Sequence, residues 1–591
     1  MNHLPLTVIA VESQAGTPAQ VAELRNQIES AGAAFLATKN LSVAEVMDLI
    51  SLKLEVGPVA VLDSGLVTGQ AMIDALVKGN WSASAALVRP NDIPTMTQDA
   101  RVMHKRIVSS ATADHRVTQP THVLLGFVRI GMSEESQLAL QSAKEYANSS
   151  SSEINIVDLI TLALIRTGCS VVAINSAGVC KRALQKSQVS NFRNEVFQQD
   201  EEQVRIERAM RTDDGFYSTF VLRKFSRRLS ILAVSKGWTP NQITLSSLLL
   251  ALAMAALFST GWWPAMVIGA IGVQLSIIID CSDGEVARYT GVSSQRGAWL
   301  DAATDRIKEY SLYAGLAFGA GLHGINIWPL AMGVMILQTV RHMSDYNFHA
   351  VQVIRETAIR SYPMSAGLDA GVKSNGTLLD SSAQLNSNRG LRWLKKIIHF
   401  PIGERWLVIS LGALFNAPVA TLWTLLILGG LSLAYTTLGR VLRSKAWRHP
   451  KEVSGSEIIE RQIDPGLGVD WFWADGSDLA TGRFAWMIPA LLRLFELGLV
   501  LVIARDYPLA YLWIFAVAFH HYDTLYRSLA GFEIPKYLKT PGLGFLGRSL
   551  IVVMSALGFI VPLEVTLLIG GIGFTALFVG FASKQWMQQI T

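Results

Sequence analysis

Cysteine is scarce in this sequence. Three of its 591 residues are cysteines, Cys169, Cys180 and Cys281, and their spacing matches no metal-binding motif. This argues against a disulfide framework and favours a reducing compartment. The first residues, MNHLPLTVIAVES, lack a basic segment followed by a long apolar core. We therefore expect no signal peptide.

Charge is also scarce. Charged residues make up 16% of the chain, whereas hydrophobic residues make up 50%. Soluble domains carry about a quarter charged residues, so an integral membrane protein is the first interpretation. The net charge of +5 is modest. In a membrane protein such an excess marks cytoplasmic loops, so we expect no nucleic-acid partner.

Residues 1–200 are predicted to form a soluble α/β domain, because short β-rich runs alternate with helical patterns such as AQVAELRNQIESAGA. The runs are LTVIAV near 7–11, GPVAVLD at 57–63, SAALV at 84–88, HVLLGFVRI at 122–130 and SVVAIN at 170–175. This alternation predicts a parallel, doubly wound sheet. Residues 201–238 are charged and amphipathic. They are interpreted as a juxtamembrane linker at the anionic cytoplasmic interface, with a solvated linker helix as the alternative.

Hydrophobic runs predict an α-helical integral membrane protein. The spans are placed at 242–259, 265–282, 299–320, 326–344, 405–417 and 419–438, then at 485–504, 508–525, 549–563 and 565–583. We assign the first six to a domain at 239–445, then a cytoplasmic loop at 446–483 and a four-span domain at 484–591. Lys and Arg gather in alternate loops, which predicts a multi-pass protein of the cell membrane with the N-terminal domain and the 280–305 loop in the cytoplasm.

One stretch, DCSDGEVARYTGVSSQRGAWLDAATD, carries four carboxylates at the ends of hydrophobic runs, where charged groups are energetically costly. Asp280 and Asp283 are three residues apart, and Asp301 and Asp305 are four apart, so each pair shares one helix face. Ionisable groups at membrane depth indicate a functional site. Four carboxylates in one pocket repel each other unless cations intervene, and hard oxygen ligands select Mg²⁺ or Mn²⁺.

Written as a pattern, the stretch is D-x2-D-G-x2-A-R-x8-G-x3-D-x3-D. It resembles the signature of the CDP-alcohol phosphotransferases, six-span membrane enzymes that move a substituted phosphate from a CDP-alcohol to an acceptor hydroxyl and release CMP. The resemblance covers about residues 225–445. It implies a metal-dependent transferase of phospholipid or phosphodiester biosynthesis, with a CDP-alcohol such as CDP-diacylglycerol as donor. Members are commonly dimeric, so a homodimer and membrane lipid are further expected partners.

The resemblance also implies roles for individual residues. Asp280 and Asp301 would bridge two metal ions, Asp283 would bind one, and Asp305 would act as general base beside the second. Upstream, TPNQIT at 239–244 resembles the P-N-x-x-T opening of the first span. The residues implied in CDP binding are Asn241, Thr244, Gly284, Ala287, Arg288, Ser294 and Gly297. TPNQIT also reads as a helix start with Thr239 as N-cap and Pro240 at the first helical position, and both interpretations can hold together.

The acceptor is predicted less closely. PIGERW at 401–406 resembles a segment of members that use an inositol phosphate, in which a basic residue holds the acceptor phosphate. Arg405 and Arg341 are the candidates, and interfacial snorkelling of Arg405 is the alternative. The acceptor would then be a polyol phosphate.

The flanking regions give weaker signals. The N-terminal domain resembles the nucleotidyltransferase-like domains fused to some family members, with Asp63 where such a fold has a metal-binding Asp. Its first loop, VIAVESQAGTPAQ, lacks the glycine-rich basic pattern, so we expect a degenerate domain. In the last domain HHYDTLYR, at 520–527, is either a metal or ligand site or an interfacial belt.

Three other interpretations remain. The carboxylates could form salt bridges with Arg288, Arg296 and Arg306. The chain could be bifunctional, with an N-terminal domain that makes the CDP-alcohol from CTP. It could be a non-enzymatic cation-binding transporter, but a cation path needs no fixed set of Gly284 and Arg288 beside the carboxylates.

Overall fold

The computed structural model divides into two compact units. It describes residues 6–79, 83–91, 98–152, 154–210, 214–292, 294–359, 363–367, 389–446, 456–464, 482–532, 535 and 541–588. The first unit comprises Met1–Met210, Ala287–Ser293 and Glu356–Ser374. The second comprises Arg211–Val286, Ser294–Arg355 and Asn375–Thr591. Each unit is described by itself.

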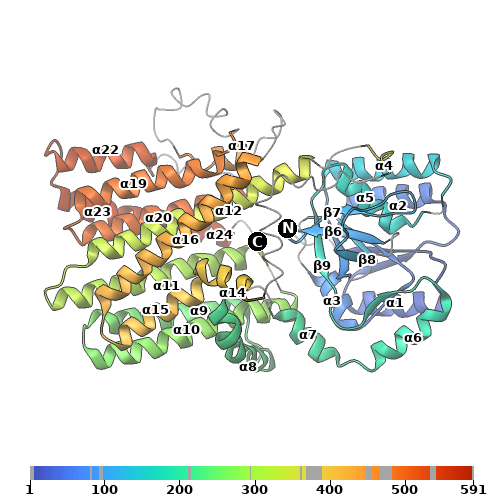
Figure 1. Cartoon of the computed structure of the whole chain (residues 1–591), viewed down its shortest axis with the longest axis horizontal. Coiled ribbons are helices and arrows are strands. Elements are labelled where there is room, and N and C mark those ends of the chain that lie inside the picture. Colours follow the sequence, from blue (N-terminus) through green and yellow to red (C-terminus); the bar gives the residue numbers. More distant parts are fainter. Residues whose placement is uncertain are drawn as a thin grey trace. The chain divides into compact units, whose positions relative to one another are not determined.

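The first unit is built on a sheet with the strand order β2-β1-β3-β8-β5-β9-β7-β6 (Figure 1). The strands are β1 (Thr7–Val11), β2 (Ala34–Ala37), β3 (Val59–Asp63), β4 (Leu66–Thr68), β5 (Ala85–Pro90), β6 (Asp99–Met103), β7 (Arg106–Ser110), β8 (His122–Ile130), β9 (Val171–Asn175) and β10 (Cys180–Arg182). Strands β4 and β10 form a separate antiparallel pair.

Helices cover both faces of this sheet (Figure 1). They are α1 (Pro18–Ser30), α2 (Val43–Val56), α3 (Gln70–Lys78), α4 (Glu134–Ser149), α5 (Ile156–Arg166), α6 (Lys186–Phe197) and α7 (Glu201–Ala209). Successive residues of β1 contribute to two different hydrophobic cores. Ile9 packs in the core formed with α2, α4 and α5, whereas Val8 packs in the core formed with α1 and α3. Burial on both faces explains why the strands read as continuous apolar runs.

The predicted α/β class is confirmed, but the sheet is mixed and not parallel throughout: β1 pairs in parallel with β2 and β3, and β5 pairs in parallel with β9. Strand β8 runs antiparallel to both β3 and β5, and β7 runs antiparallel to β9. Strands β6 and β7 form a hairpin whose two linking residues have positive φ values, 49° for His104 and 62° for Lys105. Two positive φ values are typical of a type I′ turn. The dipeptide His-Lys is not a sequence that predicts this turn.

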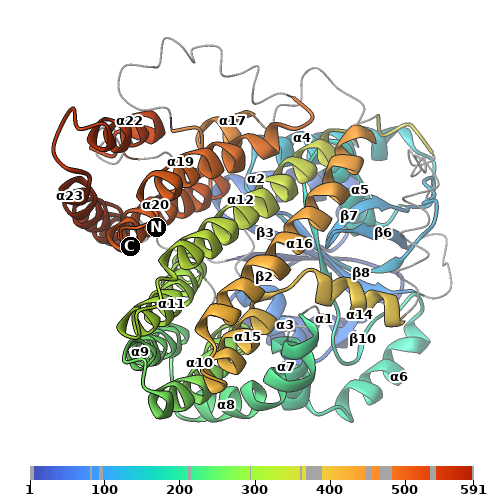
Figure 2. The same cartoon turned by 60° about the vertical axis from the view of Figure 1, so that its left-hand side comes forward.

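The second unit is helical (Figures 1 and 2). Its first helices are the π-helical segment η1 (Ser218–Leu222), α8 (Arg223–Ser235), α9 (Pro240–Ser259), α10 (Trp263–Thr290), α11 (Gln295–Leu322), α12 (Trp328–Ile359), α14 (Arg389–Ile398), α15 (Ile402–Leu414) and α16 (Pro418–Ala446). The later ones are α17 (Ser456–Glu460), η2 (Ala485–Met487), α19 (Ile488–Ala504), α20 (Leu509–Leu529), α22 (Gly544–Ala556), α23 (Leu563–Thr575), η3 (Ala576–Phe581) and α24 (Ala582–Gln588).

Among the described residues, five helical segments are long and apolar enough to cross a membrane. They are Pro240–Ser259, Trp263–Thr290, Pro418–Lys445, Ala485–Ala504 and Leu563–Trp586. The other predicted spans also coincide with helices, but α11 carries several charges and α15 and α22 are short. The predicted span 549–563 was misplaced, because α22 ends at Ala556 and a turn follows. A multi-pass membrane protein remains the interpretation.

Close packing of α9 against α11 sets the position of the carboxylates (Figure 2). A Cβ atom at Gly315 would collide with the carbonyl oxygen of Ala255, and one at Gly319 with that of Phe258. Two glycines four residues apart therefore let the backbones of α9 and α11 approach closely. Helix α9 begins as predicted, with Thr239 as N-cap in a capping box and a proline in its first turn.

Candidate active site

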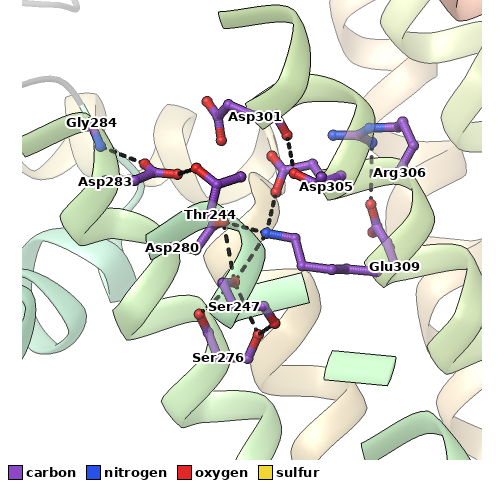
Figure 3. A network of polar contacts seen from close by, with 12 residues as sticks. Thr244, Ser247, Ser276, Asp280, Asp283, Gly284, Asp301, Asp305, Arg306 and Glu309 are labelled. Carbon is purple, nitrogen blue, oxygen red and sulfur yellow. Dashed lines mark hydrogen bonds and ion pairs between the residues drawn. The ribbon is translucent and has the colours of Figure 1, made fainter. Parts of the chain in front are cut away.

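Two consecutive helices carry the four carboxylates (Figure 3). Asp280 and Asp283 lie near the end of α10, and Asp301 and Asp305 lie in the first turns of α11. Helix α10 runs on to Thr290, so the connection is shorter than the predicted loop from Tyr289 to Gly297. The short connection folds α11 back, so that the two carboxylate pairs meet.

Three of the carboxylates converge on one point. One oxygen each from Asp280, Asp301 and Asp305 lie within 4.8 Å of one another. Carboxylate oxygens are the ligands that Mg²⁺ and Mn²⁺ prefer, so this donor set fits a hard divalent cation. These three residues form a group that could hold a metal ion, and whether they do so stays a prediction.

Asp283 stands apart from that group, because donors engage both of its oxygens. The Thr244 hydroxyl donates to Asp283 Oδ2 at 2.5 Å, and the Gly284 backbone N–H donates to Oδ1. Thr244 comes from the first turns of α9. The upstream motif and the carboxylate motif are thus joined by a direct hydrogen bond.

Lys308 belongs to α11, and its side chain is fully buried. Its ammonium forms an ion pair with Asp280 Oδ1 and another with Asp305 Oδ1 at 2.9 Å. It also donates to the Ser247 hydroxyl at 3.3 Å. Lys308 therefore links a carboxylate of α10 to one of α11.

The sequence analysis did not single out Ser247 and Glu309. Ser247 is three residues after Thr244 on α9, and its hydroxyl lies 3.3 Å from Asp280 Oδ1. Glu309 is four residues after Asp305 on α11 and is buried. Extending the one-turn spacing along each helix would have found both residues.

The other predicted donor-site residues lie at helix ends. Ser294 is the N-cap of α11 and accepts a hydrogen bond from the Gly297 N–H at 2.9 Å. A Cβ atom at Gly297 would lie 3.8 Å from Asn241 Oδ1, so these three residues gather at the start of α11. Ala287 and Arg288 lie in the last turns of α10, and Arg288 Nε donates to the Ala209 carbonyl at 2.6 Å.

Both predicted acceptor residues are buried beside α11 and α15. Arg405, 2% exposed, forms an ion pair with Glu309, with Nε 2.6 Å from Oε1. Arg341 donates to the carbonyls of His399 and Phe400, the latter at 3.1 Å. Its Nε is buried without a hydrogen-bond partner among the described residues. The snorkelling alternative does not describe Arg405, because its guanidinium is held inside the unit.

A second group of possible metal ligands lies in the C-terminal helices, where HHYDTLYR was noted. Asp464, His520 and His521 each offer an atom within 4.8 Å of the others, and all three are buried. Arg548 Nη2 lies 2.9 Å from Asp464 Oδ2, and its Nε lies 2.6 Å from Glu496 Oε1. Buried arginine already offsets these carboxylates, which argues for a structural ion-pair network. The interfacial-belt alternative is wrong for these histidines, because they are buried.

In the first unit, Asp63 is also fully engaged. Arg182 Nη2 lies 2.7 Å from Asp63 Oδ2, and Arg182 Nη1 lies 2.9 Å from Asp158 Oδ1. Asn155 donates to Asp63 Oδ2 at 2.8 Å, and the Gly65 N–H donates to Oδ1 at 2.7 Å. Two buried carboxylates share one guanidinium, and burial raises the pKa of Asp158 to about 6. These contacts describe a structural ion pair.

Comparison with known proteins gives two family matches. Residues 238–372 match the model described as CDP-alcohol phosphatidyltransferase. Residues 476–588 match a model described as a family of unknown function.

Several named proteins resemble part of the chain. The bifunctional IPC transferase and DIPP synthase of Aquifex aeolicus is 41% identical over 106 residues, 18% of this chain and 23% of that protein. The phosphatidylinositol phosphate synthase of Mycolicibacterium smegmatis is 32% identical over 126 residues, 21% of this chain and 54% of that protein. The chain thus spans between about a quarter and about half of these two relatives.

Solved structures resemble the fold weakly. The inositol-1-phosphate CTP transferase from T. maritima matches with a TM-score of 0.24 and 9% identity, over 32% of this chain and 96% of that one. A putative glucose-1-phosphate thymidylyltransferase from Bacillus anthracis matches with a TM-score of 0.26 and 9% identity, over 33% of this chain and 96% of that one.

Proposed function

We propose that this chain, whose residues 238–372 form a domain of the CDP-alcohol phosphatidyltransferase family, transfers a substituted phosphate from a CDP-alcohol to a hydroxyl acceptor and releases CMP. One observation carries the proposal: Asp280, Asp301 and Asp305 converge from two helices that carry every fixed position of the family signature. The rival interpretation, a cation-binding transporter, gives no reason for that signature.

We propose Mg²⁺ or Mn²⁺ as the metal. Asp280, Asp301 and Asp305 would hold it, and the family signature adds Asp283 as a further candidate ligand. When bound, such an ion neutralises the diphosphate and stabilises charge on the leaving CMP. The resemblance implies two ions per site. The ammonium of Lys308 is relevant to that number, because it is a positive charge that already contacts Asp280 and Asp305.

The chain's own residues supply proton transfer and orientation. Asp305 would accept the proton of the attacking hydroxyl at a carboxylate oxygen. Lys308, 2.9 Å from Asp305 Oδ1, keeps that carboxylate oriented toward α10. Thr244 fixes Asp283 in the same way. These contacts hold the carboxylates in place before substrate arrives, which is the condition for efficient electrostatic catalysis.

We propose that the donor binds at the start of α11 and the end of α10. Asn241, Ser294 and Gly297 gather at that helix start, where backbone N–H groups favour an anion. Ala287 and Arg288 belong to the same proposed site through the family signature. The named relatives suggest CDP-diacylglycerol as the donor, since one is a phosphatidylinositol phosphate synthase.

For the acceptor we propose a phosphorylated polyol, such as an inositol phosphate. The partnerless Nε of buried Arg341 supports a basic acceptor site, with Arg405 as its neighbour. Arg405 would have to share its guanidinium with Glu309.

The setting of the site is also a proposal. Alternation of basic loops supports the cell membrane, with the site and the N-terminal domain facing the cytoplasm. We propose the boundaries 1–200, 201–238, 239–445, 446–483 and 484–591 for the domains. A homodimer in membrane lipid is the proposed assembly.

The N-terminal domain is proposed to be catalytically degenerate. The contacts of Arg182, Asn155 and Gly65 engage both oxygens of Asp63, which leaves it poorly placed to take up a metal ion. This favours degeneracy over the bifunctional alternative, in which the domain would make the CDP-alcohol from CTP.

The function is tested by CMP release from CDP-diacylglycerol in detergent, with polyol phosphates as acceptors. We expect release that requires both a divalent metal and an acceptor. Asp305→Asn should lower kcat about 100-fold or more, because general-base catalysis contributes about 10²–10⁴-fold. The matched control is Asp506→Asn, an exposed carboxylate after α19. Equal rates for Asp305→Asn and wild type would refute the role of Asp305.

A further inference from the structure

The ammonium of Lys308 lies between carboxylates of α10 and α11, in a position that favours a positive charge. It contacts Asp280 Oδ1 from α10 and Asp305 Oδ1 from α11, the second at 2.9 Å. These are two of the three carboxylates that converge to form the metal group. A positive charge that bridges one carboxylate from each helix offsets their negative charge, which is one of the roles of a bridging metal ion.

Three oxygen-bearing side chains surround the ammonium of Lys308. An ammonium has three protons, and three acceptors surround this one: Asp280, Asp305 and the Ser247 hydroxyl, which lies 3.3 Å away. Its side chain is fully buried, and its ammonium lies 5.8 Å from the ring centroid of Trp406. Lys308 donates hydrogen bonds to Asp280 and Ser247 and forms an ion pair with Asp305, so this buried lysine is built into the site.

The arrangement of Asp283 points the same way. The resemblance implies that Asp283, the remaining carboxylate of the signature, would bind one of two metal ions. Both of its oxygens already accept hydrogen bonds, from the Thr244 hydroxyl at 2.5 Å and from the Gly284 N–H. Three carboxylates suffice for one Mg²⁺ or Mn²⁺, whose other positions water and phosphate oxygens can fill.

Charge supports a single ion. The four carboxylates and Lys308 together carry three negative charges when all are ionised. One divalent ion leaves a single negative charge, whereas two would leave a net positive charge in a largely buried site.

We infer that this site takes one divalent metal ion per chain, and that Lys308 supplies the second positive charge as a fixed, covalently attached cation. The inference rests on the proposed function and refines it. Lys308 is a positioning residue, since it acts through Asp280 and Asp305.

The test counts Mn²⁺ bound to the purified full-length chain in detergent, by equilibrium dialysis and electron paramagnetic resonance. The number of ions at this site is the number bound by wild type minus the number bound by Asp301→Asn. This subtraction excludes any ion bound at Asp464, His520 and His521. We expect wild type to bind one Mn²⁺ here, and Lys308→Met to bind two, with the spectrum of a spin-coupled pair. Lys308→Arg should keep one, because it keeps the charge.

Lys236→Met, which removes an exposed lysine after α8, is the matched control and should match wild type. Two ions in wild type would overturn the inference, and so would one ion in a folded Lys308→Met. If that variant does not fold, Asp283→Asn decides: one ion supports the inference, and loss of an ion overturns it.

Failure of this inference is distinguishable from failure of the proposed function. CMP release by a chain that binds two ions would refute the single-ion site alone. One ion without CMP release from any CDP-alcohol would refute the function and leave the ion count standing.

Discussion

Thr244 is the residue through which α9 reaches the carboxylates of α10. Its hydroxyl lies 2.5 Å from Asp283 Oδ2, and both side chains are buried. A hydrogen bond to a buried charge contributes about 1.5–3 kcal/mol. The threonine of the upstream motif therefore has a structural reason to be polar and β-branched.

Thr244→Val keeps the shape of the side chain and removes this hydrogen bond. We expect kcat/KM for the donor to fall about 10- to 100-fold, following from that energy. Steady-state CMP release measures it. The control is Thr424→Val on α16, whose hydroxyl donates to its own helix at the Ala420 carbonyl, 2.8 Å away. Equal losses in the two variants would contradict a specific role for Thr244.

Two of the helices that carry the site, α9 and α11, are held together by small residues. Gly315 and Gly319 face the α9 backbone, and side chains there would collide with carbonyl oxygens. Gly321 lies on the same helix and has no atom within 4 Å of where its Cβ would be. The two positions form a matched pair for a test of packing.

Gly315→Ala should destabilise the protein by about 1–3 kcal/mol, because overpacking forces the backbones apart. Gly321→Ala should be neutral or slightly stabilising, because alanine favours helix. Thermal unfolding in detergent compares the two. A melting temperature for Gly315→Ala at or above that of Gly321→Ala would show that α9 and α11 do not pack as described.

Rules that depend on neighbouring residues in the sequence predicted some helices and strands and missed others. The start of α9 followed from Thr239 and Pro240, because capping depends on neighbours in sequence. The β6–β7 hairpin was missed, because His104 and Lys105 rarely adopt positive φ. That carboxylates of α10 and α11 would meet was predictable from their spacing and the resemblance. The link from Lys308 to Asp280 was not, because it depends on how α10 and α11 fold back on each other.

The chain comprises an α/β unit and a helical unit that contains the membrane-capable helices, and the proposal gives catalysis to the second. In the first, Arg182 bridges Asp63 and Asp158, so the carboxylate expected to bind metal is already paired. The C-terminal helices contain a buried network of Asp464, Glu496 and Arg548. In both clusters an arginine already pairs with the two carboxylates.

The full-length protein should therefore release no pyrophosphate from CTP with polyol phosphates. An enzyme-coupled pyrophosphate assay measures this, with an active cytidylyltransferase as the positive control. Metal-dependent pyrophosphate release would show that the chain is bifunctional. If that release also disappeared in Asp63→Asn, the paired state of Asp63 would not describe the working domain.

The most direct test of the central claim is product formation from labelled CDP-diacylglycerol and a panel of polyol phosphates in membranes containing this protein. We expect one acceptor to yield a labelled lipid phosphodiester, with one CMP released per product. Asp301→Asn should abolish both. Product formation that continued in Asp301→Asn, or CMP release with no phosphodiester from any acceptor, would contradict the account.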